Sequence, residues 1–156
     1  MMKTFEHRSI VPGSAEQVMA FYATRNAPTK LTPPPIFFQI NDDRRRSIKD
    51  GELEFTLWFG PIPFRWLSRH EPGSSEHSFI DRMLTGPMAT WVHEHIVRDV
   101  PRGVEIIDRI QIAHKPGIAG VFTRLFFDGF PLRLLFIFRQ MATRAAVRRI
   151  AERPAL

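Results

Sequence analysis

A change in the period of the hydrophobic residues near residue 116 restricts the fold of this chain most. Before that point, apolar and polar residues alternate in short segments, which is typical of strands with one buried face. After Pro116-Gly117, apolar residues recur with helical spacing instead. This pattern predicts an α+β domain, in which a long C-terminal helix covers one face of an antiparallel sheet.

Turn residues divide the alternating part into seven expected strands. The first covers Thr4–Val11. The other six are expected at Ile36–Asp42, Glu52–Phe59, Pro63–Glu71, His77–Leu84, Thr90–Asp99 and Val104–Ala113. Short strands joined by tight Gly- and Pro-containing turns predict an antiparallel meander.

Two short helices are expected after the first strand. Ser14 is a favourable N-cap, and Gln17 three residues later completes a capping box. A second short helix, Ala27–Leu31, is expected to stop at Pro33-Pro34-Pro35, because proline has no backbone donor.

The long helix is expected to begin at Pro131, since proline is favoured in the first helical turn. Its buried face is predicted to contain Leu134, Leu135, Phe138, Met141, Ala142 and Ala145. Arg133, Gln140 and Arg144 then lie on the opposite side, and Arg139 flanks the apolar face, where a solvated edge is favoured over a buried anchor. The segment Gly117–Gly129 is either a lid over a pocket or a short helix.

Length and composition narrow the class of protein. A chain of 156 residues fits a single domain, 1–156, and the absence of cysteine excludes disulfides and thiolate metal sites. The most apolar stretch, Gly117 to Phe138, contains three charged residues, so it is not expected to span a membrane. With no signal-peptide pattern, we expect a soluble, cytoplasmic protein.

The positive charge is concentrated at the C-terminal end. The net charge is +6, and from Arg133 onward six arginines and one glutamate account for +5 of it. Charge confined to one terminal element does not favour nucleic acid as a partner. The basic helix could contact acidic lipid at a membrane surface, although burial against the sheet is the commoner role of such a helix.

Alternation places a small polar set on the buried face of the sheet. His93 and His95 share a face with Trp91, and Asp108 lies on a face otherwise made of Val and Ile. The turns set the register, which puts Asp108 opposite His95 and, to within one residue, Asp81 opposite His93. Two Asp–His pairs are therefore expected side by side on the concave face. Trp66 and His70, which share one face of the expected strand Pro63–Glu71, are expected to join them.

Three interpretations of this polar set stay open. Each aspartate satisfies a buried histidine and ties strands together, or the group forms the polar end of a ligand pocket. The third is a metal site, since two histidines two apart on a strand can chelate. Because each histidine already has an aspartate, we expect no metal and no cofactor. A histidine beside an aspartate can also act as a general base, which makes His93, His95, Asp81 and Asp108 the catalytic candidates.

An ordered set of short motifs spans almost the whole chain. It comprises Leu31-Thr32-Pro33-Pro34, Trp66, Phe79-Ile80-Asp81, Gly86-Pro87, Trp91-Val92-His93-Glu94-His95, Asp108 and Phe138-Arg139. In this order the motifs resemble the START-like (SRPBCC) helix-grip superfamily, which includes the birch-pollen allergen class and bacterial polyketide cyclase/dehydrase-like proteins. The nearest likeness is to a bacterial ligand-binding branch of mostly unknown role. The resemblance implies a seven-stranded sheet wrapped around the last helix, with a cavity between them, and it does not fix a reaction.

Three functional hypotheses follow. The first is a binding domain for a small hydrophobic or lipid-like ligand, with an apolar wall and a polar end. The expected ligand-binding residues are Trp66, His70, Phe79, Asp81, Trp91, His93, His95, Ile106, Asp108 and Phe138. The second is a cyclase or dehydratase that uses His93 or His95, and the third is a membrane-associated lipid carrier. The sequence leaves a homodimer and the identity of the ligand open.

Overall fold

The seven strands form one antiparallel sheet. The computed structural model describes residues 1–153. Their strands are β1 (Lys3–Val11), β2 (Phe37–Asp43), β3 (Gly51–Phe59), β4 (Ile62–Pro72), β5 (Ser78–Thr85), β6 (Thr90–Val100) and β7 (Gly103–Ala113). Their order in the sheet is β1-β7-β6-β5-β4-β3-β2, so the first and last strands of the chain are neighbours. The predicted meander is confirmed, and each strand lies within two residues of its expected bounds.

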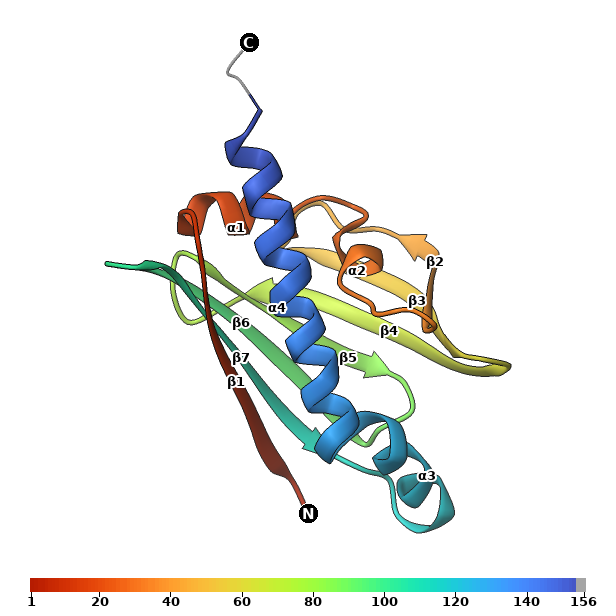
Figure 1. Ribbon diagram of the computed structural model, residues 1–156. Helices are drawn as coiled ribbons and strands as arrows, with labels where there is room; N and C mark the ends of the chain where they lie inside the picture. The colour runs from red at the N-terminus through yellow and green to blue at the C-terminus, as the bar shows by residue number, and fades with distance from the viewer. Residues whose placement is uncertain (154–156) are drawn as a thin grey trace.

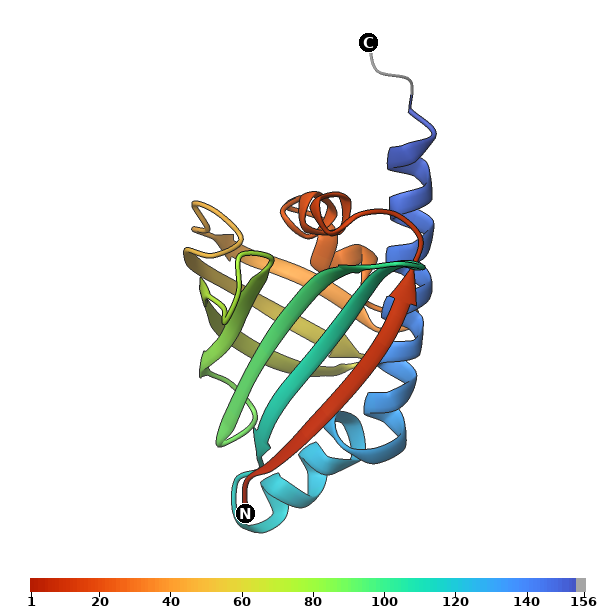
Figure 2. The ribbon, with the colours of Figure 1, turned by 90° about the vertical axis from the view of Figure 1, so that its left-hand side faces the viewer.

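Within residues 1–153, four helices complete the fold: α1 (Ala15–Tyr22), α2 (Ala27–Lys30), α3 (Gly117–Phe127) and α4 (Gly129–Ala151). The sheet curves, and α4 runs along its open, concave side (Figures 1 and 2). The short helices α1 and α2 lie toward one end of this space, and α3 lies at the other (Figure 2). The expected helix-grip α+β arrangement is therefore confirmed. Among the described residues, no helix combines the length and the hydropathy needed to cross a membrane.

Local chemistry explains where the chain turns. Ser14 accepts a hydrogen bond from the Gln17 backbone at 3.2 Å while the Gln17 side chain accepts one from the Ser14 backbone at 3.0 Å, so the predicted capping box is present. At the β6–β7 turn, Gly103 has a φ of +134°, and a Cβ there would lie 2.4 Å from the Val11 carbonyl oxygen. Only glycine fits a turn that the end of β1 approaches this closely.

The segment before the last helix forms a helix of its own. Residues 117–127 form the helix α3, so the short helix is the alternative that is observed. Asp128 then caps α4 by accepting a hydrogen bond from the Gly129 backbone at 2.6 Å. The long helix thus begins two residues before the expected Pro131.

The predicted buried face of α4 is partly wrong. The fully buried residues of α4 are Leu132, Phe136, Thr143 and Val147, whereas Leu134, Met141 and Ala145 are exposed. Leu135, Phe138 and Ala142 lie between these extremes. The helix has apolar residues on several sides, so periodicity alone could not select the stripe that packs on the sheet.

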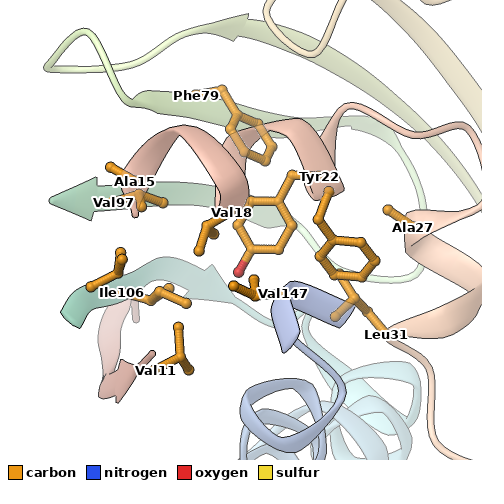
Figure 3. Close-up of a cluster of buried hydrophobic side chains, with 12 residues drawn as sticks. Val11, Ala15, Val18, Tyr22, Ala27, Leu31, Phe79, Val97, Ile106 and Val147 are labelled. Atoms are coloured by element: carbon orange, nitrogen blue, oxygen red, sulfur yellow. The ribbon is translucent and has the colours of Figure 1, made fainter. Parts of the chain in front are cut away.

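The buried core divides into two clusters. One lies beneath α1 and includes Val18, Val97, Ile106 and Val147, which converge from α1, the sheet and α4 (Figure 3). The other, toward α3, includes Trp66, Trp91, Phe127 and Leu132, and is rich in aromatic rings. Both clusters join the concave face of the sheet to helices.

Candidate functional site

A cavity of about 410 Å³ lies between the concave face of the sheet, α4 and the segment from α2 to β2. Small-molecule pockets usually measure roughly 300–1,000 Å³. Most of its wall is aromatic or aliphatic. The aromatic wall residues are Tyr22, Phe38, Phe55, Phe59, Trp66, Phe79, Trp91, Phe126 and Phe127.

Strand alternation builds the aromatic wall. Phe38 on β2 stacks on Phe55 of β3 with ring centroids 4.5 Å apart, and Phe55 stacks on Trp66 of β4 at 5.6 Å. Trp66 meets Trp91 of β6 edge to face at 5.5 Å. Rings on four strands thus form one continuous apolar surface, in the offset and edge-to-face arrangements that aromatic pairs prefer.

A belt of polar residues crosses the same face. Cross-strand pairing places His70, Asp81 and His93 in one row over β4, β5 and β6. A parallel row over β6, β7 and β1 contains His95, Asp108 and His7. The predicted registers, Asp108 opposite His95 and Asp81 opposite His93, are both confirmed.

The side chains do not form the two separate Asp–His pairs that were predicted. His93 Nε2 lies 2.8 Å from Asp108 Oδ1 in a hydrogen bond, and His95 Nδ1 lies 3.1 Å from the same oxygen. Asp81 Oδ1 is buried and finds no hydrogen-bond partner among the described residues. Diagonal neighbours on adjacent strands are within reach of side chains of this length, so His93 bonds Asp108 rather than the Asp81 directly opposite it.

Burial decides the charges of this cluster. Burial lowers the pKa of His93, while burial and the neighbouring His93 lower the pKa of His95 to about 3. Burial alone would raise the pKa of Asp108, but the contacts with His93 and His95 outweigh it and hold that pKa below its usual range. The cluster therefore carries one negative charge, behind two neutral imidazoles.

Seven of the ten predicted ligand-binding residues line the cavity: Trp66, His70, Phe79, Asp81, Trp91, His93 and His95. The structure does not bring the other three to its wall. Asp108 is buried and bonded to His93, Ile106 packs in the cluster beneath α1, and Phe138 is half-buried on α4. Asp108 can thus act on a ligand only through the histidines that it holds in place.

Arg139 is expected from the sequence at a solvated edge of α4, whereas the structure places it at the cavity wall. Its side chain lines the cavity, and its guanidinium carbon lies 5.4 Å from the centre of the Phe136 ring. The spacing does contain a signal, because Arg139 is three residues after Phe136 and four before Thr143, both on the buried stripe. That signal is readable only when the buried face of α4 is known.

The polar cluster also has the composition of a metal site. Donor atoms of His93, His95 and Asp108 all lie within 4.8 Å of one another, and such a set can ligate zinc or a similar divalent ion. In the structure the Asp108 oxygen instead accepts the hydrogen bond from His93. The expectation of no metal stays a prediction.

No family model matches the sequence, and a comparison with curated proteins found no match. Solved structures do match. The Zhui aromatase/cyclase from Streptomyces sp. R1128 is similar over 97% of both chains, with a TM-score of 0.71 and 13% identity. A START superfamily protein from Mycobacterium smegmatis matches 96% of this chain and 98% of its own, with a TM-score of 0.65 and 11% identity.

A nucleoside-diphosphate sugar epimerase from Corynebacterium glutamicum is similar over 94% of this chain, with a TM-score of 0.69 and 24% identity. The chain spans only 30% of that longer protein. Likeness at these identities establishes the architecture. The chain has the START-like (SRPBCC) helix-grip fold.

Proposed function

We propose that the chain binds one small, largely apolar molecule in the cavity between its sheet and α4. The observation that carries the proposal is a cavity of about 410 Å³ whose wall is mostly rings but which includes a few converging polar groups. Sites for small molecules are commonly built in this way. The similarity in fold to an aromatase/cyclase and a START protein supports the same reading.

The two parts of the wall suggest how a ligand would lie. Apolar surface removed from water contributes about 25 cal/mol per Å², so the body of the ligand belongs against Phe55, Trp66 and Phe127. Asp81 Oδ1 and His70 Nε2 are buried without hydrogen-bond partners among the described residues. A hydroxyl or carbonyl group of the ligand would satisfy one or both, which orients the molecule toward the polar belt.

Binding of a neutral fluorescent probe, N-phenyl-1-naphthylamine, tests the proposal. We expect one probe per chain. Leu57, on β3, lines the cavity, so Leu57→Trp should fill part of the space and weaken binding at least about tenfold. Ile10→Trp places the same bulk at an exposed position on β1 and is the matched control. If a folded Leu57→Trp variant binds the probe as the unaltered chain does, the cavity is not the site.

A second candidate function, delivery of the ligand at a membrane, is favoured by exposed apolar residues on the contacting helices α3 and α4, together termed the apolar face. They are Ile118, Val121 and Leu125 on α3, and Phe130, Leu134, Ile137 and Met141 on α4. These residues recur with helical spacing, and isolated soluble domains seldom leave so large an apolar stripe uncovered. Leu134 also lines the cavity, so the face extends to its edge.

Charge favours an anionic membrane over a second copy of the chain. Arg124 and Arg133 are exposed on the same two helices, and α4 has no acidic residue from Gly129 to Ala151. A two-fold dimer through this face would bring the arginines of both copies together, whereas anionic lipid would attract them.

Sedimentation with vesicles distinguishes these cases. We expect the chain to bind phosphatidylglycerol vesicles and to bind phosphatidylcholine vesicles more weakly. Binding should be lost in 0.5 M salt, where the Debye length is roughly 4–5 Å. Leu125→Ser with Phe130→Ser should weaken binding, while Leu84→Ser, at an exposed site on β5, should not. Lipid-independent sedimentation, or a dimer in light scattering that the double variant dissociates, would count against the membrane.

The hypothesis of acid–base catalysis rests on His93 and His95, which line the cavity and contact Asp108. A lowered pKa keeps both imidazoles neutral, which suits a base, but a base with a pKa of about 3, as for His95, is weak near neutral pH. Binding is therefore preferred over catalysis. We expect a ligand recovered after incubation with the protein to be chemically unchanged by mass spectrometry, and a new product that is absent with His93→Ala/His95→Ala would reverse this order.

A further inference from the structure

Two arginines line the cavity, and they differ in their partners. Arg45 Nε lies 2.8 Å from Asp43 Oδ1, and one of its terminal nitrogens lies 2.9 Å from Asp43 Oδ2. This bidentate pair neutralises Arg45. Among residues 1–153, no carboxylate lies within ion-pair distance of Arg139, whose guanidinium carbon lies over the face of the Phe136 ring.

In the described part of the chain, Asp81 is the one carboxylate that lines the cavity, and no ion pair joins it to Arg139. Asp108 lies behind His93 and His95 and already accepts the His93 hydrogen bond. A guanidinium always carries its charge, so Arg139 leaves a permanent, uncompensated positive charge beside an apolar space.

The field of Arg139 extends to the polar belt. Its charge is among the causes that lower the pKa values of His93 and His95, after burial and the contacts within the cluster. The helix side of the cavity is thus electropositive, while the sheet side holds Asp81. An anionic group in the cavity would be attracted to α4 and kept away from β5.

We infer that the ligand is an apolar acid, whose carboxylate or similar anionic group pairs with Arg139 while its apolar body lies against Trp66 and Phe127. This inference rests on the proposed binding function and adds the chemical class of the ligand. Arginine matches a carboxylate with two parallel hydrogen bonds, and such charge-assisted bonds are the strong ones. The contact with the Phe136 ring holds the guanidinium plane at the cavity wall.

A matched pair of competitors tests the inference: decanoate and decan-1-ol, which share one chain length and differ in charge. Each is titrated against the chain loaded with N-phenyl-1-naphthylamine at pH 7.5, below the concentration at which decanoate forms micelles. We expect decanoate to displace the probe about tenfold to a hundredfold more strongly than the alcohol, the range that one charged hydrogen bond supplies.

Variants of α4 assign the preference to one residue. Arg139→Gln should bring decanoate close to the alcohol, and Arg139→Lys should keep part of the preference because the charge remains. Arg149→Gln removes an exposed arginine of the same helix that does not line the cavity, and it should leave the preference unchanged.

The outcomes separate the inference from the function on which it rests. If the probe itself does not bind, the proposed binding function fails. If neither competitor displaces the bound probe, if both displace it equally, or if the preference for the acid survives Arg139→Gln, the ligand class is wrong while binding stands.

Discussion

Asp81 on β5 and Asp108 on β7 flank β6, and their carboxylates differ in their hydrogen-bond partners. Asp108 Oδ1 is hydrogen-bonded to His93 Nε2 and lies 3.1 Å from His95 Nδ1, whereas Asp81 Oδ1 has no hydrogen-bond partner among the described residues. Asp108→Asn should therefore lower the free energy of unfolding by about 1.5–3 kcal/mol, the value of hydrogen bonds to a charged group. Asp81→Asn should change it by less than about 0.5 kcal/mol. Urea denaturation measures both, and equal losses would show that the cluster is assigned wrongly.

The histidines predict the dependence of stability on pH. The pKa values of His93 and His95 are lowered in the folded state, the latter to about 3, whereas in the unfolded chain both titrate near 6.5. As the pH falls below 6.5, the unfolded state binds protons that the folded state does not, so stability is lost. Each histidine contributes at most about 1.4 kcal/mol per pH unit.

Asp108 affects stability at a lower pH than the histidines do. The pKa of Asp108 is also lowered, so its contribution is complete above its ordinary value near 4 and is lost only below it. The loss between pH 6.5 and 4.5 thus belongs to histidines. His95→Gln should make the decline in this range shallower than in the unaltered chain, as measured by denaturation at successive pH values. An unchanged slope would mean that His95 is protonated in the folded state.

At the scale of elements, α4 packs on the sheet through a narrow stripe of buried residues. Phe136 is 1% exposed and packs against the rings of Phe5 and His93 at 5.3 and 5.5 Å. Phe136→Ala should cost about 3–5 kcal/mol of unfolding free energy, because it leaves a void in the interior. Phe130→Ala, on the same helix at 71% exposure, should cost less than about 0.5 kcal/mol. Comparable losses in the two variants would contradict the assigned face.

The same helix shows what the sequence could and could not predict. Strands, their registers and the inward side of His93, His95 and Asp108 were readable, because alternation and turns fix which face a strand residue takes. The stripe of α4 was not readable, because apolar residues such as Leu134 and Met141 lie on its exposed side. For the same reason, the position of Arg139 at the cavity wall could not be predicted. The choice of Asp108 by both histidines depends on side-chain torsions that no spacing encodes.

At the scale of the whole molecule, the parts of the interior that hold the fold together differ from the part that forms the cavity. The two core clusters join the sheet to helices, and between the sheet and α4 the chain leaves about 410 Å³ unfilled. A folded chain gains stability by filling such space, so an open cavity with an apolar wall and polar atoms lacking partners is a feature to explain. The proposed ligand would account for both.

Isotope-filtered NMR tests this account most directly, with unlabelled N-phenyl-1-naphthylamine bound to the 13C-labelled chain. We predict nuclear Overhauser contacts from the probe to Leu57, Trp66 and Phe127, which line the cavity on the sheet and on α3. Contacts confined to the exposed residues Ile118, Val121 and Leu125, or no contacts at all, would contradict the central claim that the cavity is the binding site.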